Sequence, residues 1–435
     1  SWSCIIVKPL RIGLAGLGTV GVGVIRLLQK NAETITARAG RPIEVVAVTA
    51  RSRDKDRGVD LSGMRWHDDA VSVAQDPEID VVVELIGGSE GPARDMVETA
   101  LTRGIPVVTA NKALVALHGS ELTRLSAENA APLFFEAAVA GGIPAIKLVR
   151  EGLAADRLDS VGGILNGTCN YILTEMRTTG RDFGDVLTEA QAKGYAEAEP
   201  STDVDGWDTA HKLAILAGIA FQPIVFDTLP VHGIRDVTAS DLTFANELGY
   251  RIKLLGMARA TGDNGIEAWV RPCLVPAKAA IAAVEGVFNA VTTQGPFSGP
   301  ITISGRGAGE GPTASAVVAD LIDLARGANL PVWGVKSAPA PVSCTSLGEL
   351  KSAFYIRLDV EDRSGVMADL TSVLRDHDVS VHFVSQHDAA AGRAHLALVT
   401  HQAPEKAISA AITALSALPV VNGAPLVLKI EDSLQ

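Results

Sequence analysis

Short apolar runs alternate with longer amphipathic stretches through the first third of the chain. Such runs are typical of buried strands, and they fall at residues 10–15, 44–49, 80–86, 105–109 and 133–136. The stretches between them repeat apolar residues with helical spacing, beginning with a helix predicted from about residue 20 to residue 36. Regular alternation of strands and helices predicts an α/β domain built on a parallel sheet.

The pattern changes after residue 136 and predicts a second domain of mixed α and β structure. Residues 137–144 are small and turn-rich, residues 147–153 are helical, and residues 160–165 form a candidate strand. A long helical stretch then runs to Lys193, and an apolar helix begins at Trp207.

The C-terminal part of the chain predicts a third, separate domain. Residues 337–351 are poor in apolar bulk and rich in proline and serine, so they predict a linker. Apolar side chains then alternate with polar ones from Phe354 to Val360, as in a half-buried strand. A helix follows, then strands at 380–385 and 393–400, a helix at 405–418 and a strand at 425–430. This order is typical of a ferredoxin-like domain.

Composition and charge exclude several kinds of partner. The chain has 435 residues and a net charge of −12, which argues against nucleic acids and anionic membranes as partners because both require a basic face. No apolar run approaches the roughly 20 residues of a membrane-spanning helix, and residues 1–16 lack the basic region and cleavage site of a secretory signal. The cysteines are widely spaced and form no CxxC pattern, which predicts a reducing cytoplasm without disulfides or a zinc site; they are Cys4, Cys169, Cys273 and Cys344.

A glycine-rich turn follows the first predicted strand and opens the first predicted helix. It reads Gly16, Leu17, Gly18, Thr19, Val20, Gly21. In a strand–turn–helix unit the first glycine permits the tight turn, the second lets a pyrophosphate approach the backbone, and the third allows close packing of helix on strand. Because alternating strands and helices follow, the motif predicts a dinucleotide-binding Rossmann domain.

The choice of cofactor depends on the residues after the second strand. An acidic residue there would bind the ribose hydroxyls of NAD, but the chain places Arg51 and Arg53 after Thr49. Two guanidinium groups suit a 2′-phosphate, so NADP is the predicted cofactor, with NAD possible. The alternative is a solvated basic loop.

Two further positions fall at the carboxyl ends of strands, where ligands bind in open α/β sheets. Gly88 follows the third predicted strand, and Lys112 follows the fourth. Lys112 can reach a nicotinamide ribose or a substrate carboxylate from such a loop. A solvated lysine is the alternative.

Asp208 and Lys212 stand four residues apart where a helix is predicted to begin. Residues with this spacing project from one face of a helix, so the carboxylate and the ammonium meet. Glu197 and Glu199 lie just upstream, so the lysine is surrounded by acids at the start of an apolar helix. Such a group can hold a polar amino-acid substrate and transfer a proton. The alternative is a surface ion pair of little energetic value.

The motifs together resemble the homoserine dehydrogenase family. Those that carry the resemblance are RIGLAGLGTVG at 11–21, TANKALVA at 109–116, FEAAVAGGIP at 135–144, ILNGTCNYIL at 164–173, KGYAEAEPSTDVDGWDTAHKLAILA at 193–217 and GAGEGPTASAVVADL at 307–321. The resemblance implies reversible hydride transfer between NAD(P)H and the aldehyde of aspartate 4-semialdehyde, which gives homoserine.

The resemblance also implies roles for individual residues. Lys212 would be the general acid that protonates the forming alkoxide, and Lys112 would lie between cofactor and substrate. Asp208 and Glu197 would bind the substrate, with help from the backbone of Gly194. Glu199 departs from the family, which often has aspartate there, and residues 2–7 form an apolar leader outside the family pattern.

A sodium ion and a returning segment are further implications of the resemblance. The ion would be structural and held by the Glu136 side chain with the backbone carbonyls of Val139, Gly141 and Ile143. The glycine-rich segment before residue 310 would return to complete the nucleotide domain, and Gly309 would approach the nicotinamide. Without the resemblance, the same glycines are more often a turn and a helix cap.

The C-terminal domain resembles an ACT domain, the amino-acid-sensing module. Its ligand loop would include Asp362, Gly365 and Val366, and the expected effector is threonine. ACT domains generally pair side by side, so the resemblance implies a homo-oligomer, either a dimer or a tetramer. A module that only braces a dimer is the alternative.

The predicted fold class is therefore α/β with three parts. They are a discontinuous Rossmann domain at 1–136 and 306–336, an α+β catalytic and dimerisation domain at 137–305, and, after the linker at 337–351, a ferredoxin-like ACT domain at 352–435.

Two other functional classes compete with this assignment. A thiolate at Cys169 could attack an aldehyde, but it would need a histidine as base, and the nearest one in sequence, His211, would point about 100° away from Lys212 on its helix. An amino-acid sensor that only binds nucleotide is the non-enzymatic alternative. The presence of both lysines together with Glu197 and Asp208 argues against it.

Overall fold

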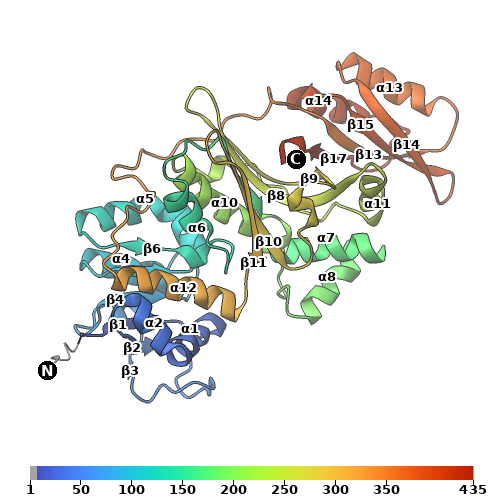
Figure 1. The fold of residues 1–435 in the computed structure, drawn as a ribbon. Helices are drawn as coiled ribbons and strands as arrows, with labels where there is room; N and C mark the ends of the chain where they lie inside the picture. Colours follow the sequence, from blue (N-terminus) through green and yellow to red (C-terminus); the bar gives the residue numbers. More distant parts are fainter. Residues whose placement is uncertain (1–6, 435) are drawn as a thin grey trace.

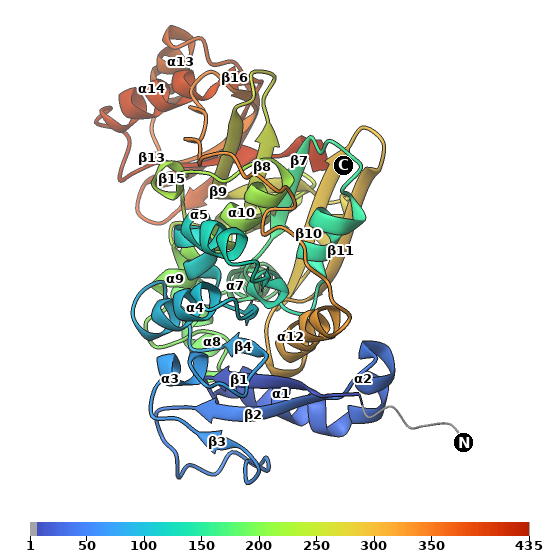
Figure 2. The same ribbon diagram turned by 90° about the vertical axis from the view of Figure 1, so that its left-hand side faces the viewer.

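The computed structural model describes residues 7–434. Three regions follow one another along the chain, with the central region between the N-terminal and C-terminal ones (Figures 1 and 2). The predicted apolar leader, residues 2–7, lies almost entirely outside the described residues. Within the described range, no helix is both long and apolar enough to cross a membrane.

A six-stranded parallel sheet forms the first region. Its order is β3-β2-β1-β4-β5-β6, and the strands span Arg65–Trp66, Ile43–Thr49, Leu10–Ala15, Val81–Glu84, Val107–Thr109 and Leu133–Phe134. The predicted parallel sheet is confirmed, and β1 has the predicted bounds. The strand β3 was not predicted, because two residues carry no periodic signal.

Helices cover both faces of this sheet. The helices α3 (Ala70–Ala74), α4 (Pro92–Thr102) and α5 (Lys112–Glu128) pack on one face. The opposite face carries α1 (Thr19–Lys30), α2 (Ala32–Ala39) and α12 (Glu310–Ala325). The single helix predicted for residues 20–36 is two helices, since the chain bends at Asn31.

The discontinuous character of this domain is confirmed by α12. Although it lies some 300 residues along the chain, Ala314, Val317 and Leu321 share a core with Ile12 and Val24. Figure 1 shows α12 lying beside the blue elements of the chain start. The returning helix therefore completes the layer that α1 and α2 begin.

A nine-stranded sheet runs through the other two regions, in the order β11-β10-β7-β8-β9-β17-β13-β15-β14. The strands of the central region are β7 (Ser160–Ile164), β8 (Tyr250–Ala260), β9 (Ile266–Pro276), β10 (Phe288–Gly295) and β11 (Gly299–Arg306). Only β7 was predicted. The long strands β8 and β9 are buried on both faces along much of their length, so no alternation marks them.

The C-terminal region has the predicted ferredoxin-like order. Its elements are β13 (Phe354–Glu361), α13 (Val366–Asp376), β14 (Val381–Ala389), β15 (Arg393–Thr400), α14 (Glu405–Ser416) and β17 (Leu426–Ile430). A two-stranded sheet of β12 (Lys351–Ser352) and β16 (Ala403–Pro404) lies beside it. The strand β17 pairs with β9 in parallel, with Lys429 opposite Cys273, so the two regions share one sheet.

The central region also contains helices. They are α6 (Ala145–Lys147) with a π-helical turn (Leu148–Gly152), α7 (Gly167–Thr179), α8 (Phe183–Ala192), α9 (Ser201–Val204), α10 (Trp207–Ala220) and α11 (Ala239–Glu247). Short 3₁₀ turns lie at Glu136–Ala138, Phe226–Thr228, Ala280–Ala283 and Asp432–Leu434. The helix α10 is buried along most of its length between α5 and the strands β7 and β8.

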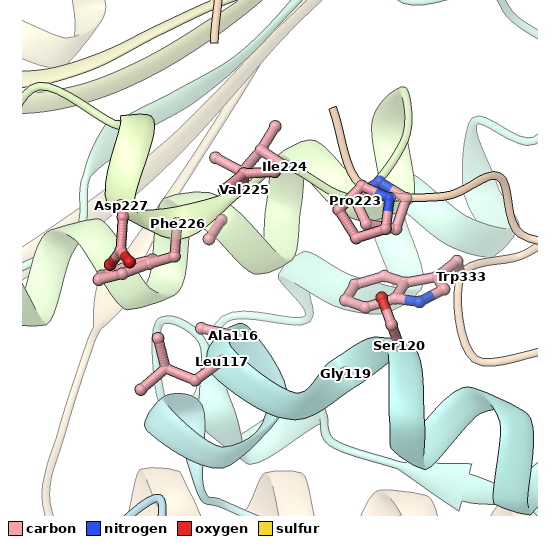
Figure 3. A pocket seen from close by; sticks show the side chains of 12 residues that line it. Ala116, Leu117, Gly119, Ser120, Pro223, Ile224, Val225, Phe226, Asp227 and Trp333 are labelled. Carbon is pink, nitrogen blue, oxygen red and sulfur yellow. The ribbon is translucent and has the colours of Figure 1, made fainter. Parts of the chain in front are cut away.

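Trp333 fixes the spacing between α5 and α10. Its ring is 4% exposed, and a Cβ added at Gly119 of α5 or at Gly218 of α10 would lie 2.5 Å from it. Figure 3 shows the Trp333 ring against the backbone of α5 at Gly119. The two glycines therefore let the helices approach the indole more closely than alanine would allow.

Replacing Gly218 with alanine should destabilise the protein by about 1–3 kcal/mol, because the new methyl group overpacks against Trp333. Gly184 in α8 is the matched control, since a Cβ there meets nothing within 4 Å. Gly184→Ala should be neutral or stabilising by up to about 1 kcal/mol. Thermal unfolding of both variants by calorimetry checks the prediction, and equal transition temperatures would contradict it.

Candidate active site

The N-terminus of α5 carries the first lysine of the site. Asn111 caps this helix, its Oδ1 accepting from the Leu114 amide at 3.0 Å. The Asn111 Nδ2 group donates to the Gly88 carbonyl at 2.7 Å. Lys112 therefore begins a helix whose start is tied to the loop after β4.

The first turns of α10 carry the second lysine. Asp208 and Lys212 project from one face, as the spacing predicted, and their Oδ2 and Nζ atoms lie 2.7 Å apart. The prediction of a helix from Trp207 is confirmed. The alternative of a surface ion pair is wrong, because Asp208 is 2% exposed and Lys212 is 9% exposed.

Asp208 is the centre of the site. Its Oδ1 pairs with Lys112 Nζ at 2.5 Å, while its Oδ2 also accepts from Asn166 Nδ2 at 2.8 Å. Lys212 Nζ donates additionally to the Leu165 carbonyl at 2.8 Å. One carboxylate thus joins α5, α10 and the start of α7.

The three charges shift one another's pKa values. Burial disfavours the Asp208 carboxylate, but Lys212 and Lys112 outweigh burial and hold its pKa well below the ordinary value. Burial and the Lys112 charge lower the pKa of Lys212, although Asp208 opposes them. Burial also disfavours the Lys112 ammonium, but Asp208, Asp203 and Glu197 together raise its pKa. The more deeply buried lysine is therefore the better proton donor.

Sequence reasoning missed Asn166 and Asp203. The Asn166 amide donates to Asp203 Oδ1 and Asp208 Oδ2, both at 2.8 Å, while its Oδ1 caps α7 at the Cys169 amide. Both residues lie inside motifs quoted for the family resemblance. No spacing rule indicated that a residue 42 positions before Asp208 would contact it.

Gly194 and Glu197 belong to the loop between α8 and α9. Gly194 has a φ of 75° and follows the end of α8. The Glu197 carbonyl accepts from Gln191 Nε2 at 2.9 Å. Glu199 bonds the Ser201 amide at 3.1 Å within its own turn, away from the lysines.

A cavity of about 810 Å³ lies along the carboxyl ends of β1, β2 and β4. Of the predicted cofactor residues, Gly16, Leu17, Gly18 and Arg51 line it. Lys55 and Arg57 line it too and were not predicted. The basic run after the second strand was the signal for them.

The remaining predicted cofactor residues do not line this cavity. Thr19, Val20 and Gly21 form the first turn of α1, directly behind the glycine-rich turn. Arg53 instead lies over the Trp66 ring, 5.7 Å from its centroid. Gly88 adjoins the lining residue Gly87, and Gly309 caps α12 with a φ of 113°.

The residues predicted to hold sodium form the turn after β6. Glu136 is 2% exposed, and its Oε1 has no hydrogen-bond partner among the described residues. Burial, followed by the charge of Asp320, raises the pKa of Glu136 to about 8. Ala140 and Gly141 have φ values of 58° and 49°. A buried carboxylate oxygen without a partner, beside a left-handed turn, is compatible with a cation ligand.

Cys169 is buried and unsuited to nucleophilic attack. Its Sγ faces the Asp203 carbonyl at 3.2 Å, and burial, followed by the charges of Asp203 and Asp208, raises the pKa of the thiol well above its ordinary value. His211 stacks on Phe226 with ring centroids 4.9 Å apart. The geometry therefore argues against the thiolate alternative.

Two of the predicted effector residues, Asp362 and Gly365, lie between β13 and α13, and the third, Val366, begins α13. Gly365 has a φ of 89° and caps α13, and Val366 is 3% exposed. The Asp362 amide donates to the Gly392 carbonyl at 2.9 Å. The loop itself is exposed.

A second cavity of about 300 Å³ lies between α5 and the turn after α10. Figure 3 shows its lining, in which Trp333 and Pro223 face Leu117 and Phe226. Neither lysine nor Asp208 lines it, so it is separate from the charged group.

A dinucleotide-type domain beside a buried lysine–carboxylate group is the arrangement of an NAD(P)-dependent oxidoreductase, and a ferredoxin-like domain is appended to it here. The comparisons with known proteins identify the family. Residues 16–136 match the family model described as homoserine dehydrogenase, NAD binding domain; residues 144–322 match homoserine dehydrogenase, and residues 354–420 match the ACT domain.

Relatives match the chain over nearly its whole length. The homoserine dehydrogenase of Pseudomonas aeruginosa is 45% identical over 98% of this chain and 99% of its own, and that of Bacillus subtilis is 38% identical with the same coverage. The crystal structure of a homoserine dehydrogenase from Thiobacillus denitrificans has a TM-score of 0.91 and 46% identity, covering 98% of this chain and 99% of its own. A hyperthermophilic archaeal homoserine dehydrogenase in complex with NADPH has a TM-score of 0.62 and 26% identity, covering 73% and 97%.

The chain belongs to the homoserine dehydrogenase family. The predicted family, the fold class and the enzyme class are thereby confirmed. The reading of the chain as a non-enzymatic sensor is wrong.

Proposed function

We propose that the protein reduces L-aspartate 4-semialdehyde to L-homoserine reversibly with a nicotinamide cofactor, as a step in the synthesis of threonine, methionine and isoleucine. The observation that carries this is the placement of Asp208 between Lys112 and Lys212. The loop after β4 connects that group to the cofactor cavity through Asn111 and Gly88. Hydride donor and proton donor would therefore act on one carbonyl.

Lys212 is the proposed general acid. The bound cofactor would supply a hydride to the carbonyl carbon, so negative charge would develop on the carbonyl oxygen. An ammonium fixed by Asp208 and the Leu165 carbonyl can stabilise that charge and then supply the proton. Its lowered pKa makes the proton transfer easier than from an ordinary lysine.

The other polar groups are proposed to hold the substrate. Asp208 and Glu197 suit its amino and hydroxyl groups, with the Gly194 backbone closing the site. Lys112 is half-exposed, with 38% of its side chain accessible, so it can contact both the substrate and the nicotinamide ribose. Binding a substrate amine would compete with the lysines for Asp208, so the pairing seen without substrate is expected to loosen.

NADP is the proposed cofactor. Arg51, Lys55 and Arg57 gather on the cavity wall after β2, and no acidic residue follows that strand directly. Three cations suit a 2′-phosphate better than a bare ribose. The relative described as bound to NADPH gives further support.

A structural sodium ion is also proposed, held by Glu136 with the carbonyls of Val139, Gly141 and Ile143. The partnerless Glu136 oxygen fits this role, because a cation would offset the cost of burying the carboxylate. Oxygen-only ligands suit a hard monovalent ion.

We propose that threonine binds at Asp362, Gly365 and Val366 and inhibits the enzyme through the ACT domain. Side-by-side pairing is supported by β14, an edge strand on which Phe383 and Val384 are 41% and 40% exposed. A dimer or tetramer would follow.

The reduced thiols of Cys169, Cys273 and Cys344 are compatible with the cytoplasm as the proposed location.

Lys212→Ala should lower kcat by roughly 10²–10⁴, the usual contribution of a positioned general acid. The effect is expected in both reaction directions, because the same group would donate and remove the proton. Lys406→Ala is the control, since Lys406 lies on the surface with 61% of its side chain exposed. Steady-state kinetics with the semialdehyde and with homoserine test this prediction. An unchanged kcat in Lys212→Ala would refute the role of Lys212 as general acid.

The pH dependence of kcat is a second test of Lys212 as the general acid. Aldehyde reduction needs the protonated Lys212, so its kcat should fall as pH rises through a pKa that burial has lowered. Homoserine oxidation needs the neutral amine, so its kcat should rise across the same range. Lys212→Arg stays protonated, so it should lose the oxidation activity and the alkaline fall in reduction.

Arg51→Ala should raise the KM for NADPH about 10- to 100-fold, the value of a charge-assisted phosphate contact. The KM for NADH should change little, because NADH lacks the 2′-phosphate. Arg53→Ala is the matched control, as Arg53 lies over Trp66 and not on the cavity wall. Equal effects of the two variants, or equal effects on both cofactors, would exclude a specific role for Arg51.

Oxidation of NADPH with aspartate 4-semialdehyde should be suppressed by millimolar threonine. Gly365→Val should keep turnover but lose that response, because a φ of 89° is strained for valine. Threonine-independent turnover of the wild type would leave the ACT domain as a dimer brace. Absence of turnover with either cofactor would refute the proposed reaction itself.

A further inference from the structure

Glu84 is a buried carboxylate to which the proposed reaction gives no role. It is the last residue of β4 and is 0% exposed. Within residues 7–434, its hydrogen bonds come only from neutral donors. Burying a carboxylate costs free energy, so the hydrogen bonds that Glu84 accepts indicate its role.

One oxygen of Glu84 holds the loop that borders the cofactor cavity. Its Oε1 accepts from the amides of Ile86 at 2.7 Å and Gly87 at 2.9 Å. Both residues line the cavity. Gly87 and Gly88 have φ values of 87° and 86°, so the loop has the left-handed conformation that glycine permits.

The other oxygen connects to the lysine side of the site. Glu84 Oε2 accepts from Thr109 Oγ1 at 2.6 Å. The same Thr109 hydroxyl accepts from the backbone amide of Asn111 at 3.0 Å. Asn111 caps α5, which begins at Lys112, and also bonds the Gly88 carbonyl. The connections form a closed loop through Glu84, Thr109, Asn111 and Gly88.

We propose that Glu84 is a positioning residue for hydride transfer. One of its carboxylate oxygens holds the loop that borders the cofactor cavity. The other oxygen positions Lys112 through Thr109 and Asn111. The inference rests on the roles proposed above for Lys112 and the cofactor cavity. The two carboxylate oxygens together accept from all three donors. A glutamine could serve the two loop amides but would leave the Thr109 hydroxyl proton without an acceptor.

Thr109→Val tests the lysine side of the network. Valine keeps the shape of threonine and removes the hydroxyl, so the Asn111 amide and Glu84 Oε2 both lose their partner. We expect kcat to fall about tenfold or more, as small displacements of reacting groups do, with the KM for NADPH within about twofold of wild type. Thr109→Ser retains the hydroxyl and should restore kcat.

Thr123→Val is the matched control for a lost hydroxyl in the same segment. Thr123 lies on α5, and its hydroxyl bonds only the Gly119 carbonyl of the same helix among the described residues. Its kcat should equal that of the wild type. Thermal unfolding of both valine variants separates a positioning effect from a stability effect.

Glu84→Gln tests both sides at once and should raise the KM for NADPH while lowering kcat. If that variant fails to fold, the comparison of Thr109→Val with Thr109→Ser still decides. Wild-type kcat in Thr109→Val, or a loss of kcat that serine does not restore, would overturn the inference. A lowered transition temperature with unchanged kcat would overturn it too.

Lys112→Met in the same assay separates this inference from the proposed function. If Lys112→Met is impaired and Thr109→Val is not, the role of Lys112 stands and that of Glu84 fails. If Lys112→Met turns over like the wild type, the lysine has no role to position, and both fail together.

Discussion

The pairing of Asp208 with two lysines is the interaction on which the rest of the structure depends. A carboxylate that is 2% exposed cannot keep its charge without partners. Its position in the first turn of α10 helps, because the helix dipole favours a negative charge there. The same dipole disfavours the nearby ammonium groups. The site is therefore stable only if α5, α7 and α10 all present their N-terminal ends to one point, which requires two sheets and a returning helix to be packed correctly.

The continuous nine-stranded sheet changes how the C-terminal domain can communicate with the site. A domain attached only by a linker could affect the central region through that linker alone. Here β17 of the ACT domain pairs directly with β9 of the central region. On the face of the ACT sheet opposite to α13 and α14, the Tyr355 hydroxyl and the Arg357 guanidinium both donate to Asp241 Oδ1, at 2.8 and 2.7 Å. Asp241 lies on α11, which packs against α7, and α7 starts at Asn166 beside Asp208. A shift of the ACT sheet therefore has a packed route to the charged group.

Much of the site could be predicted because its residues lie in local motifs. The i to i+4 spacing gave the Asp208–Lys212 pair, and the strand–turn–helix pattern gave the glycine-rich turn. Contacts between distant segments could not be predicted in this way. Neither the contact of the Asn166 side chain with Asp208 nor that of Lys112 with Asp208 follows from spacing, since each joins separate elements.

The two arginines after β2 illustrate the same limit. Arg51 lines the cavity, whereas Arg53 lies over Trp66. The long strands β8 and β9 went unpredicted because burial on both faces removes the alternation that marks a strand.

The distance between the two lysines is controlled at two points along α5. At the N-terminal end, the Asn111 cap ties the helix to the loop after β4. Farther along, Trp333 separates α5 from α10 by the thickness of its ring, because Gly119 and Gly218 leave no side chain between. A rigid helix held at two points cannot rotate, so Lys112 Nζ stays within reach of Asp208 Oδ1. Trp333 follows α12 and precedes the segment that leads to the ACT domain. The residue that sets the spacing of α5 and α10 therefore also lies just before the segment that leads to the ACT domain.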